Sequence, residues 1–387
     1  MKKYWESNWK KLIGILLFFA LYIGAIIYLN KDNTAAEKEG AYTTYAKAVA
    51  EQIVEDNTQI DSQTENIRKG DQKVILKITS GTHKGEKVVV TNYLSAMYSY
   101  YLKEGTRVVV RIDTAEDGSF ETNVYNYDRT LLIILFIAAF FILLGAMGGK
   151  KGLKSVAGLI FTFTSICFIQ IPLILKGFSP LFVTMAIIVV TTIVCFIMID
   201  GIQAKTIAAM AGTIGGVAVA GFIAIAVGKL LAITALNSDE SEALLLAKYD
   251  YTISVKGLLV CGILLSSLGA VMDVAMSIAS SINEINARNP ALSERELLKS
   301  GMNIGRDAMG TMSNTLILAF AGSSLNMMIL IYSYKVPFLQ LISTDFVSLE
   351  ILQGISGSIG IVLAVPMTAV ISAYVVKRKD RKTSNYG

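Results

Sequence analysis

Apolar residues in this chain form long runs, separated by short segments that hold most of the charge. Runs of about 18 or more apolar residues are long enough to cross a hydrocarbon layer of roughly 30 Å as a helix. Eight such runs each predict a membrane-spanning helix: 12–29, 130–147, 155–175, 181–199, 207–233, 253–280, 311–334 and 351–376. The pattern predicts a membrane all-α bundle of about eight transmembrane helices.

One hydrophilic stretch, residues 30–128, interrupts this pattern and predicts an inserted β-rich module. Segments rich in β-branched residues alternate in it with turns that contain glycine, as at 80–85. Five strands are predicted, at 46–54, 73–79, 87–91, 107–113 and 120–125. Five short strands in succession are typical of a small β-barrel, and we expect one that is similar to an OB-fold.

Lysine and arginine set the expected orientation, because short cytoplasmic loops of membrane proteins carry an excess of them. With the N-terminus inside, each expected inner segment is basic, and the last one holds five such residues (Lys377, Arg378, Lys379, Arg381 and Lys382). Both termini are therefore expected in the cytoplasm, with residues 30–128 on the outer side of the cytoplasmic membrane.

Three parts follow from these patterns. Residues 1–29 are expected to be an N-terminal signal-anchor helix, because their apolar core exceeds the 7 to 15 residues of a cleaved signal peptide. Residues 30–128 are the extracytoplasmic module. Residues 129–387 are the seven-helix transmembrane domain, with a cytoplasmic loop at 281–310.

Composition narrows the class of protein. Hydrophobic residues make up 53% of the chain and charged residues 17%, whereas soluble domains carry about 25% charged residues. The net charge of +5 does not indicate nucleic-acid binding, because no basic face is interleaved with aromatic residues. The expected partner is the lipid bilayer, and no cofactor is expected: the three cysteines are isolated, the one histidine is His83, and no phosphate-binding loop occurs.

Polar residues inside two of the apolar runs carry the candidate chemistry. An ionised aspartate at the centre of a bilayer costs at least roughly 2.5 to 3.5 kcal/mol, so Asp273 needs a partner or a hydrated surrounding. At 100° per residue, one helical face of the sixth run collects small and polar residues: Gly262, Ser266, Gly269, Asp273, Ser277, Ser280 and Glu284. Small residues alone are typical of helix contacts, but a carboxylate is not required for them.

A second polar block follows the sixth run. Ser293 and Glu296 have the spacing of a capping box and predict the start of a helix. One face of this helix holds Asn303, Asp307, Gly310 and Asn314, with Arg306 and Thr311 beside it. If the sixth and seventh helices pack as an antiparallel hairpin, Asp273 or Ser277 is a reasonable partner for the Asn314 amide.

These residues favour a transporter or permease for a small ion or solute. The candidate ion site is Asp273, Ser277, Asn303, Asp307, Thr311 and Asn314, and the boundary or gating candidates are Arg306, Glu284 and Asp200. Oxygen ligands suit Na⁺, Mg²⁺, Mn²⁺ or H⁺, although no particular metal is indicated.

A non-transporting scaffold is the alternative, as the partner-binding component of an envelope complex. In this alternative the outer β-rich module binds an envelope protein partner and the polar faces hold helices together, and the small-residue faces permit a homo-oligomer. Catalysis is not expected. An intramembrane aspartyl protease built on Asp273 and Asp307 is disfavoured, because Gly305-Arg-Asp307 is not the Gly-x-Gly-Asp sequence of such enzymes.

The blocks LGAVMDVAMS (268–277) and GMNIGRDAMGTMSNT (301–315) resemble the signature of the YibE/F family of bacterial multi-pass membrane proteins. This resemblance extends over nearly the whole chain. It implies an N-terminal anchor, an extracytoplasmic β-rich module and a bundle of further helices. It assigns no substrate and no catalytic residue to any position of this sequence.

Overall fold

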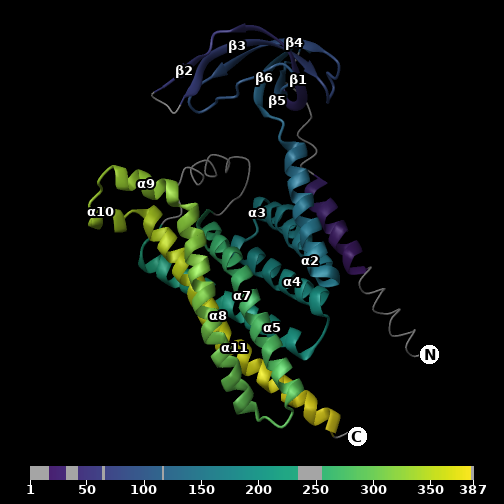
Figure 1. Ribbon diagram of the computed structural model, residues 1–387, viewed down its shortest axis with the longest axis vertical. Coiled ribbons are helices and arrows are strands. Elements are labelled where there is room, and N and C mark those ends of the chain that lie inside the picture. Colours follow the sequence, from purple (N-terminus) through teal and green to yellow (C-terminus); the bar gives the residue numbers. More distant parts are fainter. Residues whose placement is uncertain (1–16, 32–41, 63–65, 116, 234–254, 385–387) are drawn as a thin grey trace, which may run out of the picture. The chain divides into compact units, whose positions relative to one another are not determined.

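The computed structural model describes residues 17–31, 42–62, 66–115, 117–233 and 255–384 (Figure 1). The chain forms two compact units. One comprises Lys31–Leu143, and the other comprises Met1–Asn30 together with Leu144–Gly387. The first unit holds a β-sheet, and the second is helical (Figure 1).

The first unit is an antiparallel sheet that confirms the β-rich module. Its strands are β1 (Tyr42–Asp56), β2 (Gln59–Asp61), β3 (Ile67–Ile78), β4 (Lys87–Leu94), β5 (Arg107–Thr114) and β6 (Phe120–Tyr127). The order is β2-β3-β1-β5-β6, and β4 pairs with β3. Strands β4 and β6 lie near each other but form no ladder among the described residues. Closure into an OB-like barrel therefore stays a prediction.

Alternating side chains build the core of this sheet. In β3 and β5 every second residue points inward, so Val74, Leu76, Val108 and Val110 are buried. The irregular segment after β4 joins the core through Leu102, which is fully buried. The buried Gln72 side chain holds Leu102 at both backbone groups: Nε2 donates to the carbonyl oxygen at 3.1 Å, and Oε1 accepts from the N–H at 2.9 Å.

The irregular segment after β4 is also held by hydrogen bonds at the end of β1. The hydroxyl of Tyr101 donates to the carboxylate of Asp56 at 2.9 Å. The Thr58 hydroxyl and N–H donate to the same carboxylate, at 2.6 and 3.0 Å. Hydrogen bonding from the Thr58 hydroxyl is the main cause that holds the pKa of Asp56 below its ordinary value.

The helical unit contains most of the predicted membrane spans. Its described helices are Leu17–Asn30, α2 (Thr130–Ser165, which begins in the sheet unit), η2 (Ile166–Gln170), α3 (Ile171–Leu175), α4 (Pro180–Asp200), α5 (Ala204–Leu230), α7 (Val255–Arg288), α8 (Glu294–Ser323), α9 (Leu325–Ser333), α10 (Phe338–Ile342) and α11 (Asp345–Ser384). Among the described residues, five helical stretches are long and apolar enough to cross a membrane, or up to six if a bent pair is one span. The class of membrane α-bundle is confirmed, and the count of eight stays a prediction.

The expected spans 130–147 and 155–175 form one apolar stretch, Thr130–Leu175, with a break at Gly149. Gly149 has φ 55° and ψ −136°, a conformation that residues with a side chain rarely adopt. The chain turns so tightly at this point that Gly152 lies against the backbone carbonyl of Leu144. Two helical arms therefore follow each other with almost no loop.

The helix start predicted at Ser293 is confirmed. The Ser293 hydroxyl accepts from the N–H of Glu296 at 3.3 Å, and the Glu296 carboxylate accepts from the N–H of Ser293 at 2.7 Å. Helix α8 then continues without interruption to Ser323. The span expected at 311–334 lies on two helices rather than one, because α8 and α9 meet at a bend of 59° around Ser324.

Glycines set the closest helix contacts of this unit. The α5–α11 contact has Gly216 against Gly360, each facing the backbone carbonyl of the other. Helix α8 contacts α7 and α11 through Gly301 and Gly305, where an added Cβ would meet Ile282 and Val365 respectively. A larger residue at these positions would separate the helices.

We expect Gly305→Ala to lower the free energy of unfolding by about 1 to 3 kcal/mol, because its methyl group would overlap the side chain of Val365. Gly322→Ala is the matched control on α8, since an added Cβ meets nothing within 4 Å there. Thermal unfolding of both variants in the same detergent measures the difference. Equal loss of stability in the two variants would contradict the close contact.

Candidate functional site

The polar residues of α7 share one face of the helix, and that face is exposed. Its exposed residues are Gly262, Ser266, Gly269, Asp273, Ser277 and Glu284. The opposite face of α7 is apolar and buried, with Leu264, Val271, Ile278 and Ile282 in the main hydrophobic core. The side chains of Asp273 and Ser277 make no hydrogen bond or ion pair with any described residue. We call the six exposed residues the α7 stripe.

Helix α8 has a similar arrangement. Its exposed residues include every candidate that the sequence analysis placed on it: Asn303, Arg306, Asp307, Thr311 and Asn314. The Thr311 hydroxyl donates within its own helix, to the carbonyl oxygens of Asp307 and Ala308 at 3.3 and 3.1 Å. The other four side chains have no polar partner in the described part of the chain.

The two helices do pack antiparallel, but they meet through their other faces. Gly301 of α8 lies against Ile282 of α7, and Gly305 lies against Ile278. The expected hydrogen bond from Asn314 to Asp273 or Ser277 is therefore not formed, and the polar groups are not enclosed between α7 and α8. The physical reason is that glycine allows closer approach than asparagine or aspartate, so the contact forms on the glycine face.

Two boundary candidates, Asp200 and Glu284, form ion pairs. Asp200 ends α4 and binds Lys205 of α5 at 3.1 Å, with both side chains largely buried. Gly201 follows with φ 75°, so the ion pair secures a tight corner between the two helices. Glu284 binds Arg288 one turn further along α7 at 2.9 Å, and both side chains are exposed, an arrangement that contributes little stability.

Hydroxyl groups in the core form a set that the sequence analysis did not single out. Thr206 and Thr213 of α5 and Thr368 and Ser372 of α11 are fully buried, and their oxygens have no hydrogen-bond partner among the described residues. Buried hydroxyls in helices commonly donate to the carbonyl four residues back, as Thr191 does at 2.7 Å. A rotation about χ1 supplies the same acceptor to each, so these hydroxyls do not define a site.

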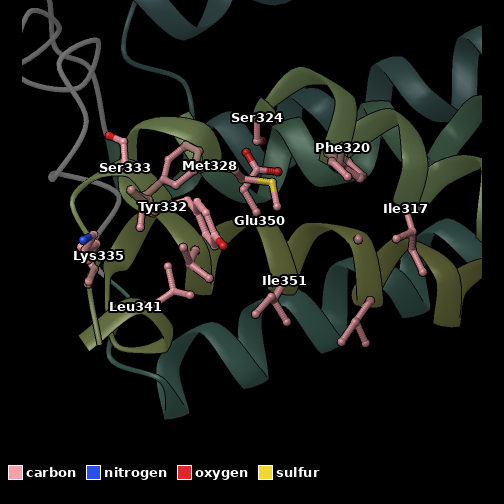
Figure 2. Close-up of a pocket in the computed structure, with 17 residues that line it drawn as sticks. Ile317, Phe320, Ser324, Met328, Tyr332, Ser333, Lys335, Leu341, Glu350 and Ile351 are labelled. Carbon is pink, nitrogen blue, oxygen red and sulfur yellow. The ribbon is translucent and has the colours of Figure 1, made fainter. Parts of the chain in front are cut away.

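A cavity of about 950 Å³ lies where α8, α9, α10 and α11 meet (Figure 2). Most of its walls are apolar, and Glu350 supplies the one carboxylate of its lining. The Oε2 atom of Glu350 is buried and has no hydrogen-bond partner in the described structure. The sequence pattern did not indicate Glu350, because the eighth apolar run begins at residue 351, whereas α11 begins at Asp345. The bend at Ser324, which shapes the cavity, was not predicted either.

No cluster of three or more histidine, cysteine, aspartate or glutamate side chains with metal-binding geometry occurs among the described residues. The α7 stripe thus offers single oxygen ligands from Asp273 and Ser277 rather than a complete metal cage. Such a surface can bind a hydrated ion or a proton if a second surface completes it.

Family comparisons agree with this architecture. Residues 136–378 match the model described as YibE/F-like protein, and residues 41–127 match the YibE/F family N-terminal domain. Neither a curated protein nor a solved structure shows a significant match to the chain. The matched residues comprise the sheet and most of the helical unit, and the chain therefore belongs to the YibE/F family.

Proposed function

We propose that this protein is a permease for a small ion or solute, and that the α7 stripe is part of its path. It would cross the bacterial cytoplasmic membrane eight times, counting both arms around Gly149, the bent α8–α9 pair and the N-terminal helix. Both termini would be cytoplasmic and the sheet module extracytoplasmic, as the distribution of lysine and arginine favours.

The observation that carries this proposal is the exposed carboxylate of Asp273 in the middle of an apolar helix. Helix α7 contains a window of high hydropathy, so much of it lies at membrane depth. An unpaired carboxylate facing lipid would be costly, which favours a hydrated surface around it. From Ser266 to Ser277 the polar face extends for about 16 Å along the helix axis, roughly half the hydrocarbon thickness.

Glycines on the α7 stripe favour a second copy of the chain as its cover. An added Cβ at Gly262 or Gly269 would meet nothing within 4 Å, whereas the glycines at the α5–α11 contact are tightly enclosed. Glycine weakens a helix by about 1 kcal/mol relative to alanine, so a glycine in open space needs another reason. A helix of a second copy supplies that reason, and exposed Arg306 supplies a charge opposite to Asp273.

We expect Asp273→Asn to lower ion flux by at least about tenfold, because it removes the charge but retains the shape of the side chain. Full-length protein in proteoliposomes is assayed in turn for flux of Na⁺, Mg²⁺, Mn²⁺ and H⁺. Asp117→Asn, in a turn of the sheet module that is bonded to Ser119, is the matched control. Unchanged flux in Asp273→Asn, or no flux of any of these ions in the parent protein, would reject the assignment.

Contact between two copies is tested by cross-linking in native membranes. In a chain with its three native cysteines replaced by alanine, cysteines are placed singly at Gly262, Ser266 and Gly269. We expect oxidation to produce a covalent dimer from at least one of them. Ala275→Cys, on the buried face of α7, should yield none. A monomer at all three stripe positions would contradict contact between two copies at the stripe.

Exposed aromatic and apolar side chains on the sheet module favour the second candidate function, partner binding. Tyr93 is 75% exposed and Met97 is 81% exposed, at the end of β4 and just beyond it. Tyrosine and methionine are enriched in protein interfaces, and exposed apolar groups that cluster mark contact surfaces.

A photo-reactive amino acid at position 97 tests this candidate. We expect it to cross-link to one envelope protein in intact cells, whereas the same group at Glu104, which is also exposed, should not. The additional change Tyr93→Ser should lower the yield of the cross-linked product. Equal labelling from the two positions would contradict a specific surface.

A further inference from the structure

The cavity between α8 and α11 has the two parts that a binding site for an amphiphilic molecule needs. Figure 2 shows Lys335 and Ser333 at one end and Ile317 at the other, with Glu350 between them. The wall near Ile317 is apolar and includes Phe320 and Ile351. An apolar pocket of several hundred cubic ångströms with a few polar groups is the usual form of a small-molecule site.

The packing of the helices does not explain why a carboxylate stands at position 350. Its Oε2 atom is buried and unpartnered, and neither of its carboxylate oxygens forms a hydrogen bond with a described residue. A buried acceptor without a donor is destabilising, and more so when it carries charge. An apolar residue at this position would fill the same space without that penalty. Since the carboxylate lines an open cavity rather than a closed core, a ligand that donates to it accounts for its presence.

We propose that this cavity binds a lipophilic amine, a molecule with a compact apolar body and one protonated amino group. The ammonium group donates to the carboxylate of Glu350, and the apolar body lies toward Ile317 and Phe320. This orientation directs the ligand away from Lys335, which is at the opposite end of the cavity (Figure 2). The site is independent of the α7 stripe, because no stripe residue lines it.

A substitution at Gly354 can block the apolar end of the cavity. An added Cβ at this position would lie at 3.8 Å from Ile317 and 3.9 Å from Phe320, which are ordinary contact distances. A methyl group is therefore tolerated, and a longer side chain extends into the cavity. Gly354→Leu thus blocks the proposed body of the ligand and leaves the carboxylate in place.

Three fluorescent probes with the same aromatic ring test the proposal: naphthylethylamine, naphthylethanol and naphthylacetate. Each is titrated against the full-length protein in lipid nanodiscs, and the signal of empty nanodiscs is subtracted. We expect the amine to bind at least about tenfold more tightly than the alcohol, a factor that corresponds to about 1.4 kcal/mol. Tighter binding of the anionic naphthylacetate would identify Lys335 as the recognition charge and overturn the proposal.

Three variants test whether the probes bind in this cavity. Glu350→Gln should reduce affinity for the amine by at least about tenfold and change affinity for the alcohol by less than about twofold, since only the charged interaction is lost. Glu294→Gln, an exposed site in the first turn of α8, should change neither. Gly354→Leu should weaken both the amine and the alcohol. Amine binding that is unchanged in Glu350→Gln or in Gly354→Leu would show that the probe binds elsewhere.

Discussion

Two helices in hydrocarbon gain little from covering each other's apolar surface, because lipid tails are as apolar as leucine side chains. Close approach of backbones is what holds them together, and it requires small residues at the contact. In this protein, α5, α8 and α11 meet their neighbours at Gly216, Gly301, Gly305 and Gly360. The position of these glycines decides which face of each helix is buried, and thereby which faces remain for chemistry.

This constraint explains why the polar residues of α7 and α8 face outward. Once Gly301 and Gly305 have drawn α8 against Ile282 and Ile278, the side of α8 that holds Asn303, Asp307 and Asn314 points away from the contact. The helical period of 3.6 residues fixes which residues share a face. The period does not determine which part of the protein packs against that face. The packing depends on contacts with residues far along the chain.

Structural features that depend on residues adjacent in the sequence could therefore be predicted from it. Features that depend on contacts between residues far apart in the sequence could not. The capping box at Ser293 and the strands β3 to β6 follow from a few adjacent residues, and the structure confirms them. The bend at Ser324 has no proline to indicate it; its local signal is the short sequence Gly322-Ser-Ser324, since helices also kink at Gly/Ser pairs, and this signal alone does not specify a bend of this size. The burial of the Glu350 Oε2 atom depends on that bend, since the bend brings α9 and α10 to the start of α11 and encloses the cavity.

Asp273 and Glu350 illustrate two solutions to the same electrostatic problem. Both are carboxylates on apolar helices without a partner in the described chain, but Asp273 lies on an open face whereas Glu350 has an oxygen that is buried beside a cavity. An open face can be solvated by water only if a second surface keeps lipid away, and the second copy proposed over α7 would supply that surface. A cavity already excludes lipid chains on most sides, so a single small donor is enough to satisfy Glu350. The surroundings, rather than the type of residue, therefore distinguish the two carboxylates: the path proposed at Asp273 needs a cover over α7, whereas the amine proposed at Glu350 needs only the cavity beside it.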